Sequence, residues 1–235
     1  MPTSFLHVRL DAPAPLLPEL AEFYSGRLGL GATPSDPDGA AVEVGESVLE
    51  LLPASGSPFY HFALLAPGDR FEAVLDWACE HVDLLPDRET GEEVFDFTNW
   101  DAKACYFHDP AGNIVEVIAH RGIGETGVTG VFSAGELLGV SEIGLVGDPA
   151  PLAAELERGL GLELWDGTVD GEARLAFVGE KARTLILCRA GRPWLPTGRP
   201  AEAHPVEVLL RGLSEGAVAL NGGGWVRRRE TRAEG

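Results

Sequence analysis

Glu50, His61 and Glu116 each stand between two apolar residues at a spacing of two, which places them on the apolar face of a β-strand. The flanking residues are Val48 and Leu52, Phe59 and Ala63, and Ile114 and Ile118. A buried carboxylate without a partner is strongly destabilising, so these positions need an explanation. Imidazole and carboxylate groups are good ligands of divalent metal ions. The alternative explanation is that arginines pair with the carboxylates and hydrogen bonds satisfy the histidine.

The elements that must position these residues repeat along the chain. Hydrophobic periodicity predicts a unit of the order strand, helix, strand, strand, strand, about 55 to 60 residues long. The first copy comprises residues 5–10, 16–28 (the helix), 40–44 and 47–52, and the second comprises residues 59–65, 71–82 (the helix), 94–97, 104–107 and 114–118. The third comprises residues 140–146, 149–160 (the helix), 175–178 and 184–188, and a fourth begins at 206–210.

Four segments of these units resemble the vicinal oxygen chelate superfamily, which includes glyoxalases, extradiol dioxygenases and bleomycin-resistance proteins. They are His61–Leu64, Tyr106–Val117, the helix end Phe23–Leu30 and the strand Val48–Leu51. The likeness covers residues 5–120 and, more weakly, residues 138–210. It implies an α+β fold, with tandem βαβββ units forming curved mixed sheets and helices on the convex face. Two paired units would hold a metal on the concave face.

The resemblance also implies a set of metal ligands. The superfamily takes them from the first and last strands of two paired units, and those positions here carry His7, Glu50, His61 and Glu116. We therefore expect one divalent metal ion (Fe, Ni, Co, Zn or Mn). A slip of the first strand by one residue would turn His7 away from the site. The corresponding positions of the third unit carry Ser141, Ile186 or Leu187, and Val206, so we expect no site there.

Two enzyme chemistries and one binding function remain open. Two histidines and two glutamates are similar to the bacterial glyoxalase I set, in which Glu50 or Glu116 would move a proton as an isomerase or lyase does. Without Glu50, the remaining His7, His61 and Glu116 look like the facial triad of two histidines and one carboxylate in iron dioxygenases. Tyr106 then matches the tyrosine that hydrogen-bonds the substrate of ring-cleaving dioxygenases. In both, the metal chelates neighbouring oxygens of a small substrate. The alternative is a metal-free protein that sequesters a small molecule, as bleomycin-resistance proteins do.

The charge balance excludes some partners. The chain of 235 residues has 37 acidic and 18 basic side chains and a net charge of -19, which argues against nucleic acid. There is no apolar run of the roughly 18 residues that span a bilayer and no signal-peptide pattern at the N-terminus, so we expect no membrane partner. Three scattered cysteines suit a reducing compartment, and we predict a cytoplasmic protein.

Composition and repeats together predict the domain organisation. Residues 1–121 would be two paired units with the metal site, and residues 122–137 a linker. Residues 138–211 would be a degenerate third unit with the start of a fourth, and residues 212–235 a flexible tail. An unpaired third unit leaves one curved face incomplete, so it would close a sheet edge or form a homodimer contact. Phe95, Phe97 and Trp100 are candidates for a lid or substrate wall, with ordinary core packing as the alternative, and Trp194 is a candidate for part of a proline-rich strap.

Overall fold

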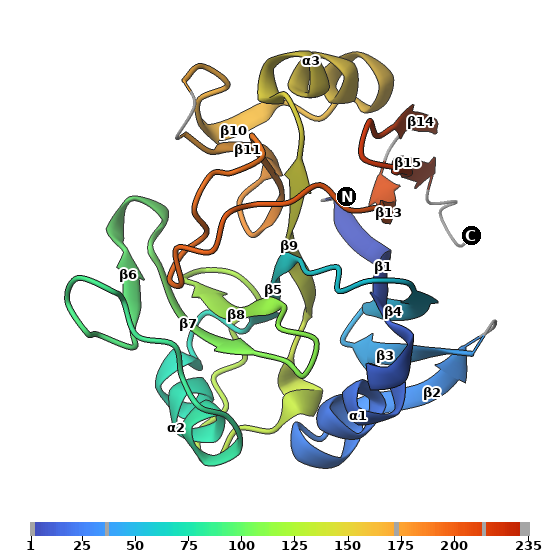
Figure 1. Ribbon diagram of the computed structural model, residues 1–235. Coiled ribbons are helices and arrows are strands. Elements are labelled where there is room, and N and C mark those ends of the chain that lie inside the picture. The colour runs from blue at the N-terminus through green and yellow to red at the C-terminus, as the bar shows by residue number, and fades with distance from the viewer. Residues whose placement is uncertain (1–2, 36–37, 172–173, 213–214, 231–235) are drawn as a thin grey trace, which may run out of the picture.

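The computed structural model describes residues 3–35, 38–171, 174–212 and 215–230, which form two mixed β-sheets with α-helices packed on them (Figure 1). The first unit contains β1 (Ser4–Pro13), α1 (Leu17–Glu22), β2 (Gly31–Ser35), β3 (Gly39–Val44) and β4 (Ser47–Ala54). Short helical turns flank α1 at Ala14–Leu16 and Phe23–Arg27. The second unit contains β5 (His61–Ala66), α2 (Phe71–His81), β6 (Phe95–Phe97), a 3-10 turn at Thr98–Trp100, β7 (Ala102–His108) and β8 (Ile114–His120).

The second half of the chain repeats this order less completely. Another 3-10 turn at Ala134–Glu136 leads to the third unit, which contains β9 (Gly139–Val146), α3 (Pro149–Leu160), β10 (Leu164–Gly167), β11 (Ala176–Glu180) and β12 (Arg183–Cys188). The last segment contains β13 (Val206–Gly212), β14 (Gly216–Ala219) and β15 (Gly224–Glu230). The α+β class and the tandem βαβββ units predicted from the sequence are confirmed.

The pairing of the units differs from the prediction for residues 1–121. The first sheet has the order β14-β15-β13-β1-β4-β3-β2, and the second has the order β10-β11-β12-β9-β5-β8-β7-β6. The first unit therefore pairs with the last segment through β1 and β13, whereas the second unit pairs with the third through β5 and β9. The third unit finds its partner inside the chain, so the reason for expecting it to form a dimer contact no longer applies.

Residues beyond 212 also differ from the expected flexible tail. β15 runs parallel to β13 and carries Arg227, Arg228 and Arg229, which were expected in a solvated tail. Arg228 donates hydrogen bonds to the carbonyl of Leu160, at the end of α3, and to the Thr3 hydroxyl. Val226 is fully buried. Val226 fixes this strand, because its side chain fills the core, and Arg228 is half-buried on the same face while Arg227 and Arg229 are exposed. Residues 231–235 lie outside the described residues.

One continuous apolar core joins the helices to both sheets. Alternate residues of the central strands enter it, such as Val8 and Leu10 of β1 and Phe62 and Leu64 of β5. A second cluster, which includes Ala63, lies on the opposite face of the second sheet. Strand β5 is buried on both faces, which explains its nearly continuous apolar sequence. No helix in the described part of the chain is long and apolar enough to cross a bilayer.

The turn between β7 and β8 is held by a buried carboxylate. Asp109 accepts hydrogen bonds from the hydroxyl of Tyr24 at 2.8 Å and from the side-chain amide of Asn113 at 2.7 Å. It also accepts bonds from the backbone amides of Ala111 and Asn113. The side-chain oxygen Oδ1 of Asn113 in turn accepts a hydrogen bond from the backbone amide of Tyr60. This turn, which lies within the segment Tyr106–Val117, thus fixes β8 and β5.

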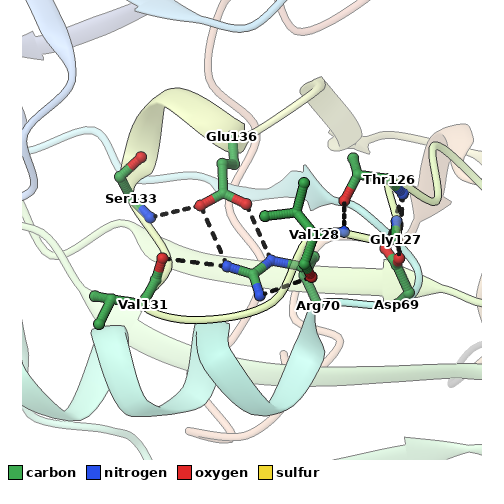
Figure 2. Close-up of polar contacts among 8 residues, drawn as sticks. All are labelled: Asp69, Arg70, Thr126, Gly127, Val128, Val131, Ser133 and Glu136. Atoms are coloured by element: carbon green, nitrogen blue, oxygen red, sulfur yellow. Dashed lines mark hydrogen bonds and ion pairs between the residues drawn. The ribbon is translucent and has the colours of Figure 1, made fainter.

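An arginine at the start of α2 anchors the linker between the second and third units. Arg70 is only 4% exposed and pairs with Glu136 at 3.0 Å. It also donates hydrogen bonds to the carbonyls of Val128 and Val131, while Asp69 accepts from the amides of Thr126 and Gly127 (Figure 2). The linker is thereby tied to the second unit although its sequence is rich in glycine.

We predict that Arg70→Ala destabilises the protein by about 2 kcal/mol, because it leaves Glu136 and two carbonyls without their donor. Urea unfolding would measure this, and limited proteolysis would show faster cleavage within residues 122–133. The control is Arg121→Ala, which removes an ion pair between largely exposed side chains and should cost less than about 1 kcal/mol. Equal effects of the two variants would contradict the role given to Arg70.

Candidate metal centre

The imidazole of His61 is held at the start of β5, in the middle of the second sheet. Its ring is buried, and Nδ1 lies 3.1 Å from the carbonyl oxygen of Ile114, to which it can donate its proton. That hydrogen bond leaves Nε2 as the free lone pair, as is usual for a metal-binding histidine. Nε2 lies 3.5 Å from a carboxylate oxygen of Glu116. Burial lowers the pKa of His61 to about 4, so the ring is neutral at physiological pH.

The carboxylate of Glu116 lies on β8, next to β5. Its backbone is opposite Ala63 on one side and Tyr106 on the other. The Tyr106 hydroxyl donates a hydrogen bond to it, and the Tyr106 ring lies 6.2 Å from the His61 ring, centre to centre. Tyr106 therefore contacts the carboxylate and helps to orient it.

A third ligand candidate, Glu142, comes from β9 on the other side of β5. Its backbone is opposite Ala63 and Thr184. One donor atom each from His61, Glu116 and Glu142 lie within 4.8 Å of one another, and all three residues are buried. Among the described residues, no other group of three or more His, Cys, Asp and Glu side chains meets this condition.

The two glutamates have unusual acidities. Burial, followed by the charge of Glu142, raises the pKa of Glu116 well above its ordinary value. Burial also raises the pKa of Glu142. Two carboxylates so close together in a desolvated site repel each other. A cation between them would offset both this repulsion and the cost of burying their charges.

The donor set fits a divalent metal ion. Glu142 Oε1 is buried without a hydrogen-bond partner, which is a destabilising state for a carboxylate oxygen unless a cation accepts it. One neutral imidazole and two carboxylates form an oxygen-rich, charge-balancing set for such an ion. The last strand of the third unit, β12, carries the aliphatic residue Ile186 beside the cavity, at the place that Glu116 occupies on β8. Three protein ligands would leave positions for oxygens of a substrate.

Aromatic side chains surround this cluster. Of the three aromatic residues predicted for a lid, a wall or core packing, Phe97 and Trp100 line the cavity, whereas Phe95 packs against Tyr106. Phe177 and Trp194 also line it. The cavity, of about 50 Å³, can hold an ion with a few waters. The Trp194 ring lies 4.9 Å from the His61 ring, and it packs directly over Gly144, where a Cβ would lie within 2.9 Å of it. The proline-rich strap that contains Trp194 thus covers the site, and the lack of a side chain at Gly144 permits this contact.

His7 and Glu50, the other two predicted ligands, lie in the first sheet. They are close to each other, with His7 Nε2 3.1 Å from Glu50 Oε2. The nearest cation to Glu50 is Arg9, whose Nε lies 2.6 Å from the same oxygen. Although burial raises the pKa of Glu50, hydrogen bonds from Ser35 and Arg9 lower it below its ordinary value. The structure therefore brings together His61 with Glu116 and His7 with Glu50, but not all four.

The sequence prediction that the third unit has no ligand missed Glu142. A regular strand starting at Val140 would place Ser141, not Glu142, on the face of the metal site. The pairing of β5 with β9 is irregular between Ala63 and Leu64, and this irregularity shifts the alternation by one residue. The available signal was Glu142 itself, a carboxylate in an otherwise apolar strand.

Solved structures share this architecture. The match to a candidate dioxygenase from Bacillus subtilis subsp. subtilis str. 168 spans 97% of this chain and 84% of the dioxygenase chain, with 16% sequence identity and a TM-score of 0.58. The match to glyoxalase I from Zea mays spans 96% of this chain and 92% of the glyoxalase chain, with 14% sequence identity and a TM-score of 0.53. No protein-family model and no curated protein sequence matches the chain. The chain has the fold of the vicinal oxygen chelate superfamily, as the resemblance implied.

His120 lies two residues beyond Ile118 on β8 and is fully buried. Its ring stacks on the ring of Trp100, with 6.4 Å between the two ring centres. Burial, followed by the charge of Lys181, lowers the pKa of His120 from 6.5 to about 4.

This burial predicts a loss of stability in mild acid. Between pH 6.5 and 4 the unfolded chain takes up a proton at His120 that the folded protein does not, so the unfolding free energy decreases as the pH falls. In metal-free protein His120→Leu should remove up to about 3 kcal/mol of this dependence. Urea titrations at several pH values would measure it, with His81→Ala on α2 as the control. Parallel pH profiles for wild type and His120→Leu would contradict the prediction.

Proposed function

We propose that the protein is a metal-dependent enzyme that chelates a small substrate through neighbouring oxygens at His61, Glu116 and Glu142. The observation that carries this proposal is the convergence of these three buried donors on one cavity, with one glutamate oxygen left unpaired. The fold shared with glyoxalase I and with a candidate dioxygenase is consistent with it but does not choose the reaction.

Of the enzyme chemistries, proton transfer of the isomerase or lyase type has the better support. The bound ion, whether Fe, Ni, Co, Zn or Mn, would supply Lewis acidity toward two substrate oxygens. Glu116 and Glu142 are buried carboxylates beside the place of the ion, which would let one of them take a proton from a substrate carbon and return it. Tyr106 orients Glu116, and the Ile114 carbonyl orients His61. A ring-cleaving dioxygenase normally uses two histidines and one carboxylate, the inverse of this set.

The walls of the cavity favour a small, largely apolar or ring-bearing substrate. Phe97, Trp100, Phe177 and Trp194 offer aromatic faces beside the proposed ion. Trp194 and Phe97 would exclude water from the bound substrate. We further propose a cytoplasmic location, because Cys79, Cys105 and Cys188 are all free thiols.

The second candidate function is metal-free binding of a small molecule. The aromatic cavity favours it, since a hydrophobic pocket can sequester a ligand without chemistry. In that case Glu116 and Glu142 would share a proton instead of a metal ion.

Elemental analysis of protein purified without a histidine tag tests the proposal. We expect about one divalent ion per wild-type chain, and at least about 100-fold weaker binding in His61→Ala and Glu142→Gln, because loss of a ligand should exceed the effect of losing a ligand's supporting contact. The matched control is His7→Ala, which changes the same residue type in the first sheet and should retain the ion.

The outcomes separate the candidates. Loss of the ion in His7→Ala but not in His61→Ala would contradict the assignment of the site. No ion in the wild type, together with tight binding of an aromatic ligand that Trp194→Ala weakens, would support the metal-free binding function instead.

A further inference from the structure

The central strands of the two sheets have the same arrangement. β1 runs parallel to β4 and antiparallel to β13, just as β5 runs parallel to β8 and antiparallel to β9. In the first sheet Arg9 lies directly between Glu50 and Glu207. In the second sheet Ala63 lies directly between Glu116 and Glu142.

This register makes the two sets of residues equivalent position by position. His7 and His61 both lie two residues before the central position, on the same side of their strands. Glu50 corresponds to Glu116, and Glu207 corresponds to Glu142. The first sheet therefore repeats the histidine and both glutamates of the candidate metal centre, and the central position differs, with arginine in place of alanine.

The arginine supplies the positive charge at this place. Arg9 Nε lies 2.6 Å from Glu50 Oε2, and Arg9 Nη1 lies 2.8 Å from Glu207 Oε2. A guanidinium presents its donors in a rigid plane and is permanently charged, so it can bridge two carboxylates much as a cation does. Ala63 has no such group, so no guanidinium of this strand lies between Glu116 and Glu142.

We propose that His7, Glu50 and Glu207 form a second, latent divalent-metal site, and that the guanidinium of Arg9 occupies the place of the ion. The residue at one strand position then decides whether the two glutamates hold a metal ion or an arginine. The equivalence rests on the proposed function only in taking His61, Glu116 and Glu142 as a metal site. The ligand class is a divalent cation with a preference for oxygen and imidazole donors.

Arg9→Ala gives the first sheet the alanine that the second sheet has. Equilibrium dialysis against Mn²⁺ alone, followed by elemental analysis, should show one more bound ion in Arg9→Ala than in wild type. Adding Glu207→Gln to Arg9→Ala should abolish the additional ion. Arg211→Ala, on the neighbouring strand β13, is the matched control and should bind as many ions as wild type.

The difference between variants separates this proposal from the proposed function. One ion in wild type and two in Arg9→Ala supports both, whereas none in wild type and one in Arg9→Ala supports the latent site alone. The same number in wild type and Arg9→Ala overturns the latent site, whatever that number is. Should Arg9→Ala be unfolded without metal, recovery of its circular dichroism signal with Mn²⁺ supports the proposal, and failure to recover counts against it.

The reciprocal variant Ala63→Arg provides an independent readout. It should fold, because the first sheet holds the same residues in the same register, and it should lose the ion that wild type binds. Retention of that ion, or a chain that does not fold, would argue that the two positions are not equivalent.

Discussion

Carboxylates on the faces of the two sheets, buried at Glu50, Glu116 and Glu142 and half-buried at Glu207, require positive charge nearby. In the first sheet the charge is the guanidinium of Arg9, held between Glu50 and Glu207. In the second sheet Glu116 and Glu142 lie beside Ala63, and burial raises both of their pKa values. The same backbone arrangement therefore produces an internally neutralised cluster in one sheet and, in the other, a cluster suited to an ion.

The second sheet positions its cluster of His61, Glu116 and Glu142 through its central strand. Strand β5 is central in its sheet, so residues from the strands on either side converge on it without any loop contribution. Hydrogen bonds accepted by the side chains of Asp109 and Asn113 fix the turn before β8, and Trp194 covers the cavity where it packs on Gly144. The site is thus built on rigid elements and walled by aromatic side chains, an arrangement that suits chemistry on a small molecule away from water.

Much of the fold was predictable from the sequence because its signals are local. Hydrophobic alternation located the central strands, and helical spacing located α2 and α3. The alternation around His61 and Glu116 correctly placed both on the inner face of their strands. The strands β14 and β15 were missed, because β14 is short and β15 carries three consecutive arginines. Pairing of β15 with β13 and of β14 with β15, rather than propensity, stabilises them.

The sequence by itself determined that histidines and glutamates occupy inner strand positions in a repeated βαβββ unit. Only the tertiary structure decided which units pair, and hence which of these residues meet. An unpaired edge of β1 or β5 can accept more than one strand, and the choice depends on contacts far apart in the chain. The irregular pairing of β5 with β9 then turned Glu142 rather than Ser141 toward His61, because a shift of one residue reverses the face of a strand.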